Sequence, residues 1–144
     1  MSEAFSWPVR VYVEDTDAGG IVFYANYLKF FERARTEWVR ANGIALRGRL
    51  DEGIGFVVHS LDVRYHRPAL LDDQLAVTAE LLEATRTAMS FRQQALRQDS
   101  GELLVSASVR VACVELASGR PRRMPPEVAD LAQRTLAVSH NGND

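Results

Sequence analysis

Apolar and polar residues follow a helical period over one long segment of the N-terminal half. From residue 27 onwards, apolar side chains recur every three or four positions, and charged residues lie between them. Asn26 is suited to cap the start of such a helix, and Gly43 is suited to end it. The expected apolar face comprises Tyr27, Phe30, Phe31, Ala34, Trp38 and Ala41. We therefore predict an amphipathic helix over residues 27–42, covered by a sheet.

Elsewhere the apolar residues alternate with period two, which is typical of strands that bury one face. Leu46 to Gly55 has no such alternation and is expected to be a polar connection. His59 falls on the apolar register of its strand, and Pro68 ends that strand's ladder. The predicted strands cover residues 9–14, 57–66, 75–81, 89–95 and 103–113, and Pro125-Pro126 opens a short C-terminal helix.

One strand, a long helix and four strands joined by short turns predict an α+β fold. The four strands are expected to form an antiparallel meander, and the five-stranded antiparallel sheet should wrap around the long central helix. The outer register, with Ser106, Ser108 and Arg110, is expected to stay polar or to be covered by a second subunit. Residues 1–138 are expected to form a single domain, followed by a disordered tail at 139–144.

Composition excludes several classes of protein. Of the 144 residues, 47% are hydrophobic and 25% are charged, and the net charge of −2 gives no reason to expect binding to nucleic acid. No apolar run approaches the ~20 residues that cross a bilayer, and no signal-peptide pattern is present. Cys113 is the only cysteine, which gives no support for an oxidising compartment. We expect a soluble, cytoplasmic protein without a membrane span.

The segment from Tyr12 to Tyr27 carries the candidate chemistry. In it, Asp17 is followed by Gly19 and Gly20, and a short apolar stretch then leads into the helix. This order places a carboxylate and flexible backbone beside a helix N-terminus, where unpaired N–H groups can polarise a carbonyl oxygen. Such an arrangement suits acyl transfer, although aspartate and glycine are also ordinary turn residues.

The same residues resemble hotdog-fold acyl-CoA thioesterases of the 4-hydroxybenzoyl-CoA thioesterase type, and within them the YbgC-like branch associated with the Tol–Pal system. The resemblance covers about residues 7–133. It implies a hotdog fold, hydrolysis of an acyl-CoA thioester to the free acid and CoA, no metal or cofactor beyond the CoA of the substrate, and a homodimer or homotetramer with the site at a subunit interface. The matching runs are Trp7-Pro-Val-Arg-Val-Tyr12, Glu14-Asp-Thr-Asp-Ala-Gly-Gly20, Ala25-Asn-Tyr27 and Phe31-Glu-Arg-Ala-Arg-Thr-Glu37.

The resemblance also assigns roles to single residues. It implies that Asp17 is the catalytic base or nucleophile, and that backbone N–H groups near Tyr24 form the oxyanion hole. Many YbgC-like members have a histidine where this chain has Tyr24, so no imidazole is expected there. CoA phosphates call for basic residues at the rim of the site. The expected substrate-binding residues are Gly19, Gly20, Asn26, Tyr27, Arg86 and Thr87, with the cluster Arg120, Arg122 and Arg123 as an alternative phosphate site.

Other interpretations stay open at this point. Glu32 is suited either to pair with Arg35 three residues later or to support the site from behind. The three histidines and one cysteine lack metal-ligand spacing. The chain is alternatively a hotdog hydratase or dehydratase, which would rely on a histidine that residues 12–27 lack, or a non-catalytic binding partner of an acyl thioester or acyl-carrier protein. Acyl-carrier protein is also open as the acyl donor in place of CoA.

Overall fold

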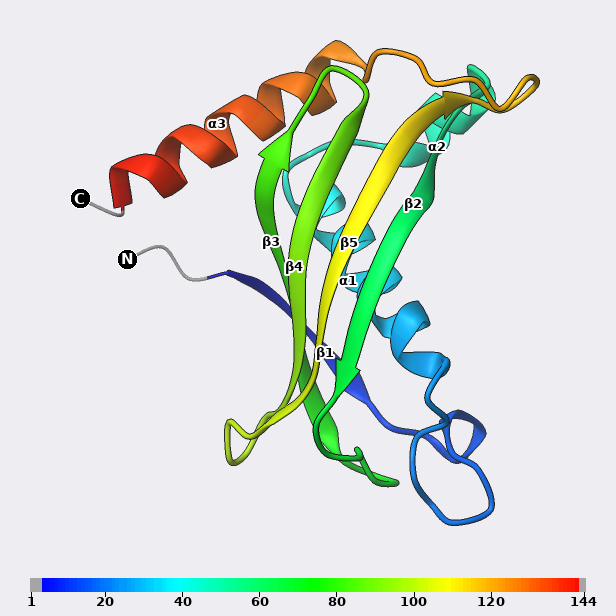
Figure 1. The fold of residues 1–144 in the computed structure, drawn as a ribbon, viewed down its shortest axis with the longest axis vertical. Coiled ribbons are helices and arrows are strands. Elements are labelled where there is room, and N and C mark those ends of the chain that lie inside the picture. The colour runs from blue at the N-terminus through cyan, green and yellow to red at the C-terminus, as the bar shows by residue number, and fades with distance from the viewer. Residues whose placement is uncertain (1–3, 143–144) are drawn as a thin grey trace.

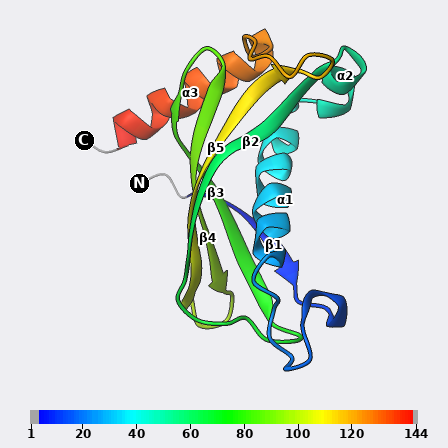
Figure 2. The same ribbon diagram turned by 45° about the vertical axis from the view of Figure 1, so that its right-hand side comes forward.

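The structure is a computed structural model that describes residues 4–142. A curved sheet lies against the long helix α1 (Asn26–Ala41), which runs along one of its faces (Figures 1 and 2). This arrangement confirms the predicted α+β architecture. The remaining elements are β1 (Phe5–Arg10), the 3₁₀ turn η1 (Val13–Asp15), α2 (Leu46–Asp51), β2 (Ile54–Tyr65), β3 (Gln74–Ala84), β4 (Ala88–Arg97), β5 (Leu103–Glu115) and α3 (Pro126–Gly142).

Within the described residues the strand order is β1-β3-β4-β5-β2, and every neighbouring pair is antiparallel. The predicted meander of the last four strands is wrong for β2, which pairs with β5 and forms one edge of the sheet. The segment 66–73 crosses instead to β3, which pairs with β1. This connection is longer than the about two to five residues of a typical hairpin loop, so it does not require the strands that it joins to pair.

Helix α1 buries the predicted apolar face, with one exchange. Val39 is buried, whereas Ala41 is exposed. The predicted end at Gly43 is confirmed: its φ is +81°, its N–H donates to the carbonyl of Arg40 at 3.0 Å, and the N–H of Ile44 donates to that of Val39 at 3.3 Å. These two bonds satisfy carbonyls of the last turn that would otherwise lack partners.

The predicted cap at the start of α1 is wrong. The residue at the N-cap is Ala25, which has no side chain to cap the helix. Asn26 belongs to the first turn, and its Nδ2 donates instead to the backbone carbonyl of Asp15 at 2.8 Å. The side chain of Asn26 therefore ties the preceding loop to the helix.

The first strand also differs from its prediction. β1 ends at Arg10, and the side chain of Val13 is 73% exposed rather than buried. The cause is local: the carboxylate of Asp15 accepts the N–H of Tyr12 at 2.8 Å, and the chain turns into the 3₁₀ segment η1. The side chains of Val9 and Val11 remain in the core.

Three further segments depart from the sequence predictions. His59 is exposed rather than part of the core, because both faces of the edge strand β2 are exposed over residues 57–62; the register of β2 also shifts between Val58 and Ser60. The connection 46–55 contains the helix α2 and the first residues of β2. The backbone of α3 is helical to Gly142, so it continues through 139–142 of the expected tail, and residues 143–144 lie outside the described part.

The sheet has an apolar inner face and a polar outer one. Ser106, Ser108 and Arg110 lie on the outer register as predicted, and Arg110 donates to Ser90 at 3.0 Å. The inner residues of β3, β4 and β5 form one hydrophobic cluster with α1. Gln93 is the one polar residue buried among them in the described chain. Between residues 4 and 142, no helix is long and apolar enough to cross a membrane.

Candidate active site

Asp17 opens a tight hairpin loop between β1 and α1. The N–H of Asp17 donates to the carbonyl of Ile21 at 3.0 Å, the N–H of Gly20 returns to the carbonyl of Asp17 at 3.1 Å, and Thr16 is bridged to Val22. The Asp17 side chain is exposed, and its Oδ1 accepts the N–H of Gly19 at 2.9 Å. Among the described residues its Oδ2 has no hydrogen-bond partner. The Gly19 N–H therefore orients the carboxylate through Oδ1 and leaves Oδ2 accessible to solvent or substrate.

The two glycines of this loop have different reasons to be there. Gly20 has a φ of +74°, a left-handed conformation that residues with a side chain rarely adopt. Gly19 has an ordinary φ, and a Cβ there would lie 3.5 Å from Oδ1 of Asp17, which is a normal contact. The structure thus accounts for Gly20 by backbone conformation, and it gives no steric reason for Gly19.

The hairpin loop rests on a second loop, 69–71, that precedes β3. The N–H of Val22 donates to the carbonyl of Ala69 at 2.9 Å, and the N–H of Leu71 donates to the carbonyl of Gly20 at 3.0 Å. Tyr27, expected in the substrate site, is buried, and its hydroxyl accepts the N–H of Ala69 at 3.0 Å. Burial raises the pKa of Tyr27. Within this chain Tyr27 supports the loop from behind, and its contact with substrate stays a prediction.

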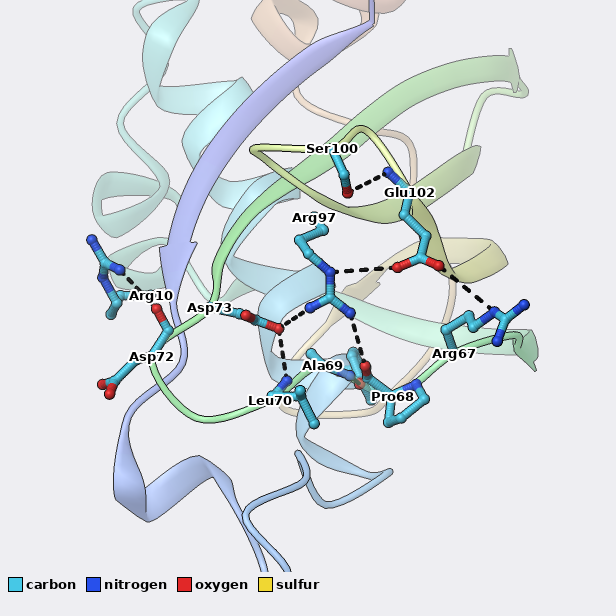
Figure 3. Close-up of polar contacts among 11 residues, drawn as sticks. Arg10, Arg67, Pro68, Ala69, Leu70, Asp72, Asp73, Arg97, Ser100 and Glu102 are labelled. Carbon is cyan, nitrogen blue, oxygen red and sulfur yellow. Dashed lines mark hydrogen bonds and ion pairs between the residues drawn. The ribbon is translucent and has the colours of Figure 1, made fainter.

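A polar network fixes loop 69–71 in turn (Figure 3). Arg97 forms an ion pair with Asp73, and Asp73 also accepts the N–H of Leu70 at 2.8 Å. Arg97 donates to the carbonyl of Pro68 at 3.3 Å, and its Nε lies 3.4 Å from Glu102. Sequence analysis missed this contact, because nothing along the chain links Asp73 to Arg97. Arg97 and Asp73 therefore fix loop 69–71, on which the Asp17 loop rests.

Unpaired backbone donors lie at the start of α1, after the Asp17 loop. The N–H of Asn26 is bonded to the carbonyl of Phe23 at 2.9 Å, whereas the N–H groups of Tyr24 and Ala25 have no acceptor within residues 4–142. The Tyr65 hydroxyl donates to the carbonyl of Tyr24 at 3.0 Å. Partial burial is the main cause that raises the pKa of the Tyr65 hydroxyl, and the neighbouring Tyr24 raises it further. The Tyr24 side chain is 63% exposed, so within one chain it lines no enclosed pocket.

A cavity of about 480 Å³ lies elsewhere, between α1, α2 and the first half of β2. Most of its lining is apolar, and Glu32 and Arg35 add charge. The expected ion pair between these two is not formed: Arg35 donates to the buried Oε1 of Gln93 at 2.8 Å. Sequence analysis missed this cavity, because residues from separate helices and strands line it. Neither Asp17 nor Tyr24 belongs to that lining.

Arg86 and Thr87 lie in the turn between β3 and β4, at the opposite end of the sheet from the Asp17 loop (Figure 1). β3 has 11 residues, which span roughly 36 Å, so one chain does not bring Arg86 to Asp17. The carbonyl of Arg86 accepts the N–H of Met124 at 2.9 Å. The turn therefore lies beside the connection that carries Arg120, Arg122 and Arg123.

No metal site is evident in the part of the chain that the structure describes, because no three histidine, cysteine or acidic side chains are grouped as ligands would be. Cys113 is buried, and burial raises its pKa. Its thiol is therefore held in the protonated form, which is a poor nucleophile and a poor metal ligand.

Comparison with known proteins gives a consistent set of relatives. Residues 11–131 match the thioesterase-like superfamily. The chain is 41% identical over 124 residues to the acyl-CoA thioester hydrolase YbgC of Escherichia coli O6:H1, covering 86% of this chain and 92% of that protein. It is 44% identical over 129 residues to the acyl-CoA thioesterase YbgC of Haemophilus influenzae, covering 89% and 93%.

Solved structures show the same fold. A probable thioesterase from Bartonella henselae superposes with a TM-score of 0.75 at 35% identity, covering 85% of this chain and all of that one. The DHNA-CoA thioesterase of Staphylococcus aureus superposes with a TM-score of 0.89, covering 95% and 93%, and at 20% identity this likeness concerns the fold alone.

Proposed function

The chain belongs to the thioesterase-like superfamily and is a thioester hydrolase with a hotdog fold, and on that premise we propose that it hydrolyses acyl-CoA to the free acid and CoA. The observation that carries the proposal is the presence of two groups that lie seven and eight residues apart in the chain. A solvent-open carboxylate oxygen of Asp17 lies in a loop that leads directly to the unpaired N–H groups of Tyr24 and Ala25.

These two groups supply what thioester hydrolysis needs. The N–H groups of Tyr24 and Ala25 donate to the carbonyl oxygen of the thioester and stabilise the negative charge that develops on it. Asp17 then acts by one of two routes, and the proposal covers both. It attacks the acyl carbon, expels the CoA thiolate and leaves a mixed anhydride that water hydrolyses, or it takes a proton from water, whose hydroxide adds to the carbon and expels the thiolate. In both routes the departing thiolate takes up a proton.

The edge of the sheet supports assembly with a second copy. β2 is an edge strand, and Val57, Val58, Leu61 and Tyr65 on it are 41–50% exposed. A long apolar edge invites pairing with another strand. Antiparallel pairing of two β2 strands would place the end of one, where Tyr65 meets Tyr24, against the start of the other. We propose that the protein is a homodimer or a homotetramer built on this edge.

This arrangement also brings the separated site residues together. β2 begins at the same end of the sheet as the β3–β4 turn (Figure 1). In the proposed dimer, Arg86 and Thr87 of one copy approach the Asp17 loop of the other, where they would bind the CoA phosphates. Arg120, Arg122 and Arg123 lie at the same end and would add to that charge. Gly19, Gly20 and Asn26 would line the approach to Asp17 within the first copy.

The test is thiol release from a panel of short, long and aromatic acyl-CoAs by the wild-type protein. We expect hydrolysis of at least one of them without added metal, and the panel then identifies the acyl class. Acyl-carrier-protein thioesters belong in the same panel, since either carrier presents the same thioester. Binding of acyl-CoA without any thiol release would contradict the proposal and favour a non-catalytic binding partner instead. The cytoplasmic location of this protein stays a prediction.

A further inference from the structure

The cavity beside α1 has the size and lining of a small-molecule site. Its volume is about 480 Å³, within the range of about 300–1,000 Å³ of typical ligand pockets. Apolar side chains from both helices and from the sheet provide most of its wall, among them Val39, Leu46, Ile54, Phe56 and Phe91. Such a wall favours an alkyl or aromatic segment of a ligand.

The buried side chain of Gln93 fixes the position of one cation in this wall, Arg35. The guanidinium of Arg35 donates to Oε1 of Gln93 at 2.8 Å. Gln93 is completely buried, and its Nε2 donates to the carbonyls of Phe31 and Thr78, each at 3.0 Å. Because the amide of Gln93 is bonded to both a helix and a strand, it fixes where the guanidinium of Arg35 lies.

The guanidinium of Arg35 lacks an anionic partner. Within residues 4–142 no carboxylate lies within 4.0 Å of it, whereas Arg49, the other arginine of the cavity, lies 3.1 Å from Glu52 and 3.0 Å from Glu127. Burial lowers the pKa of Arg35, and the field of Glu32 opposes this. A guanidinium has five N–H donors, and burying its charge without a partner is unfavourable. The cavity therefore combines an apolar wall with a guanidinium that forms no close ion pair within the described residues, and the carboxylate of Glu32 lies in the same lining.

We propose that this cavity binds an acyl group that ends in a carboxylate, so that the substrate is the CoA monothioester of a dicarboxylic acid. The methylene chain lies along the apolar wall, and the terminal carboxylate pairs with Arg35 in the two-pronged geometry that guanidinium groups favour. The inference rests on the proposed function, because antiparallel pairing of two β2 strands is what brings the cavity of one copy towards the Asp17 loop of the other.

Binding of non-hydrolysable thioethers tests this inference apart from catalysis. The probes are an S-(ω-carboxyalkyl)-CoA and an S-alkyl-CoA of equal chain length, titrated calorimetrically into the wild-type protein, Arg35→Met, Arg35→Gln and the control Arg33→Met. Arg33 lies on the same helix and is exposed. We expect the wild type and Arg33→Met to bind the carboxylate probe about tenfold or more tightly than the neutral one, and both Arg35 variants to lose that preference.

Arg35→Gln keeps a polar side chain beside Gln93, so it remains informative if Arg35→Met does not fold. Equal binding of the two probes by the wild type would overturn the inference even without any variant. A preference that survives in folded Arg35→Gln would overturn it as well. Neither probe is hydrolysed, so these results are independent of whether Asp17 is catalytic. A wild type that hydrolyses neutral acyl-CoAs but shows no carboxylate preference would contradict this inference and leave the proposed function standing.

Discussion

The hydroxyl of Tyr65 donates to the backbone carbonyl of Tyr24 at 3.0 Å, across 41 residues of sequence. The bond joins the last residue of β2 to the residue whose N–H is proposed to stabilise the oxyanion. It therefore connects the edge strand of the sheet, where a second copy is proposed to bind, with the backbone at the start of α1.

Replacing Tyr65 by phenylalanine should slow turnover with little effect on substrate affinity. One hydrogen bond contributes about 0.5–1.5 kcal/mol, so a loosened Tyr24 backbone should lower kcat by about twofold to tenfold while KM stays within about twofold. The phenyl ring keeps the contact with Tyr24, whose ring lies edge-on to that of Tyr65 at 6.2 Å. Steady-state kinetics on Tyr65→Phe provide the measurement, and an unchanged kcat would show that this bond does not position the N–H groups.

The ion pair of Arg97 with Asp73 is expected to support the Asp17 loop at a distance. Asp73→Asn removes one of the two carboxylate charges beside Arg97 and weakens the acceptor of the Leu70 N–H. The side chains of Asp73 and Arg97 are only about one-fifth exposed. We expect the free energy of unfolding to fall by about 1–2 kcal/mol and kcat to fall with it. Urea unfolding and kinetics give the two values. Asp99→Asn, in the exposed β4–β5 turn, is the matched control and should change neither.

The two loop glycines should respond differently to the same substitution. Gly20→Ala should destabilise the protein by about 1 kcal/mol, since a residue with a Cβ is strained at a φ of +74°. Gly19→Ala should change stability by less than about 0.5 kcal/mol, because its backbone is ordinary and the added methyl meets only a normal contact. Thermal or urea unfolding of the two variants measures these losses of stability. Equal losses would mean that the conformation at residue 20 is not what the loop requires.

The sequence predicted the parts of the fold that depend on local pattern. The helical period of Tyr27, Phe30, Phe31 and Ala34 identified α1 and its buried face, because the core-facing side of a helix repeats along the chain. Gly43 was likewise identified correctly as the helix end. Asn26 was not, because its amide found a better acceptor in the loop, and no local pattern reveals that competition.

Long-range relationships were beyond the sequence. β2 pairs with β5 rather than with β3. Which strand becomes its neighbour depends on how the whole sheet packs around α1, and no local pattern in the sequence encodes that choice. The resemblance implied a site at a subunit interface, with the Asp17 loop from one chain and the CoA contacts of Arg86 from its neighbour, and that arrangement stays a prediction. A single chain holds the two residues at opposite ends of the sheet. The support of Asp17 by Asp73 and Arg97, and the contact of Arg35 with Gln93, join residues without any common motif.

The proposed interface along β2 can be disrupted at one position. Leu61→Lys places a charge at the middle of the exposed apolar edge, where Leu61 is 41% exposed. We expect light scattering to show a shift from dimer or tetramer towards monomer, because a buried charge opposes strand pairing, and thioesterase activity should fall with the loss of the shared site. Leu82→Lys is the matched control: Leu82 is similarly exposed, at 47%, but lies on β3, away from this edge. A Leu61→Lys protein with the same oligomeric mass as the wild type would show that the interface lies elsewhere.

The rate of thiol release by Asp17→Asn, compared with the wild type and with Asp130→Asn, tests the central claim most directly. Asp130 is an exposed aspartate on α3, far along the chain from the loop. The amide introduced by Asp17→Asn retains an oxygen for the Gly19 N–H but has no charge with which to attack carbon or remove a proton. The account predicts that Asp17→Asn lowers kcat/KM by about 100-fold or more with its melting temperature unchanged, and that Asp130→Asn matches the wild type. An Asp17→Asn protein that hydrolyses acyl-CoA as fast as the wild type would contradict the account.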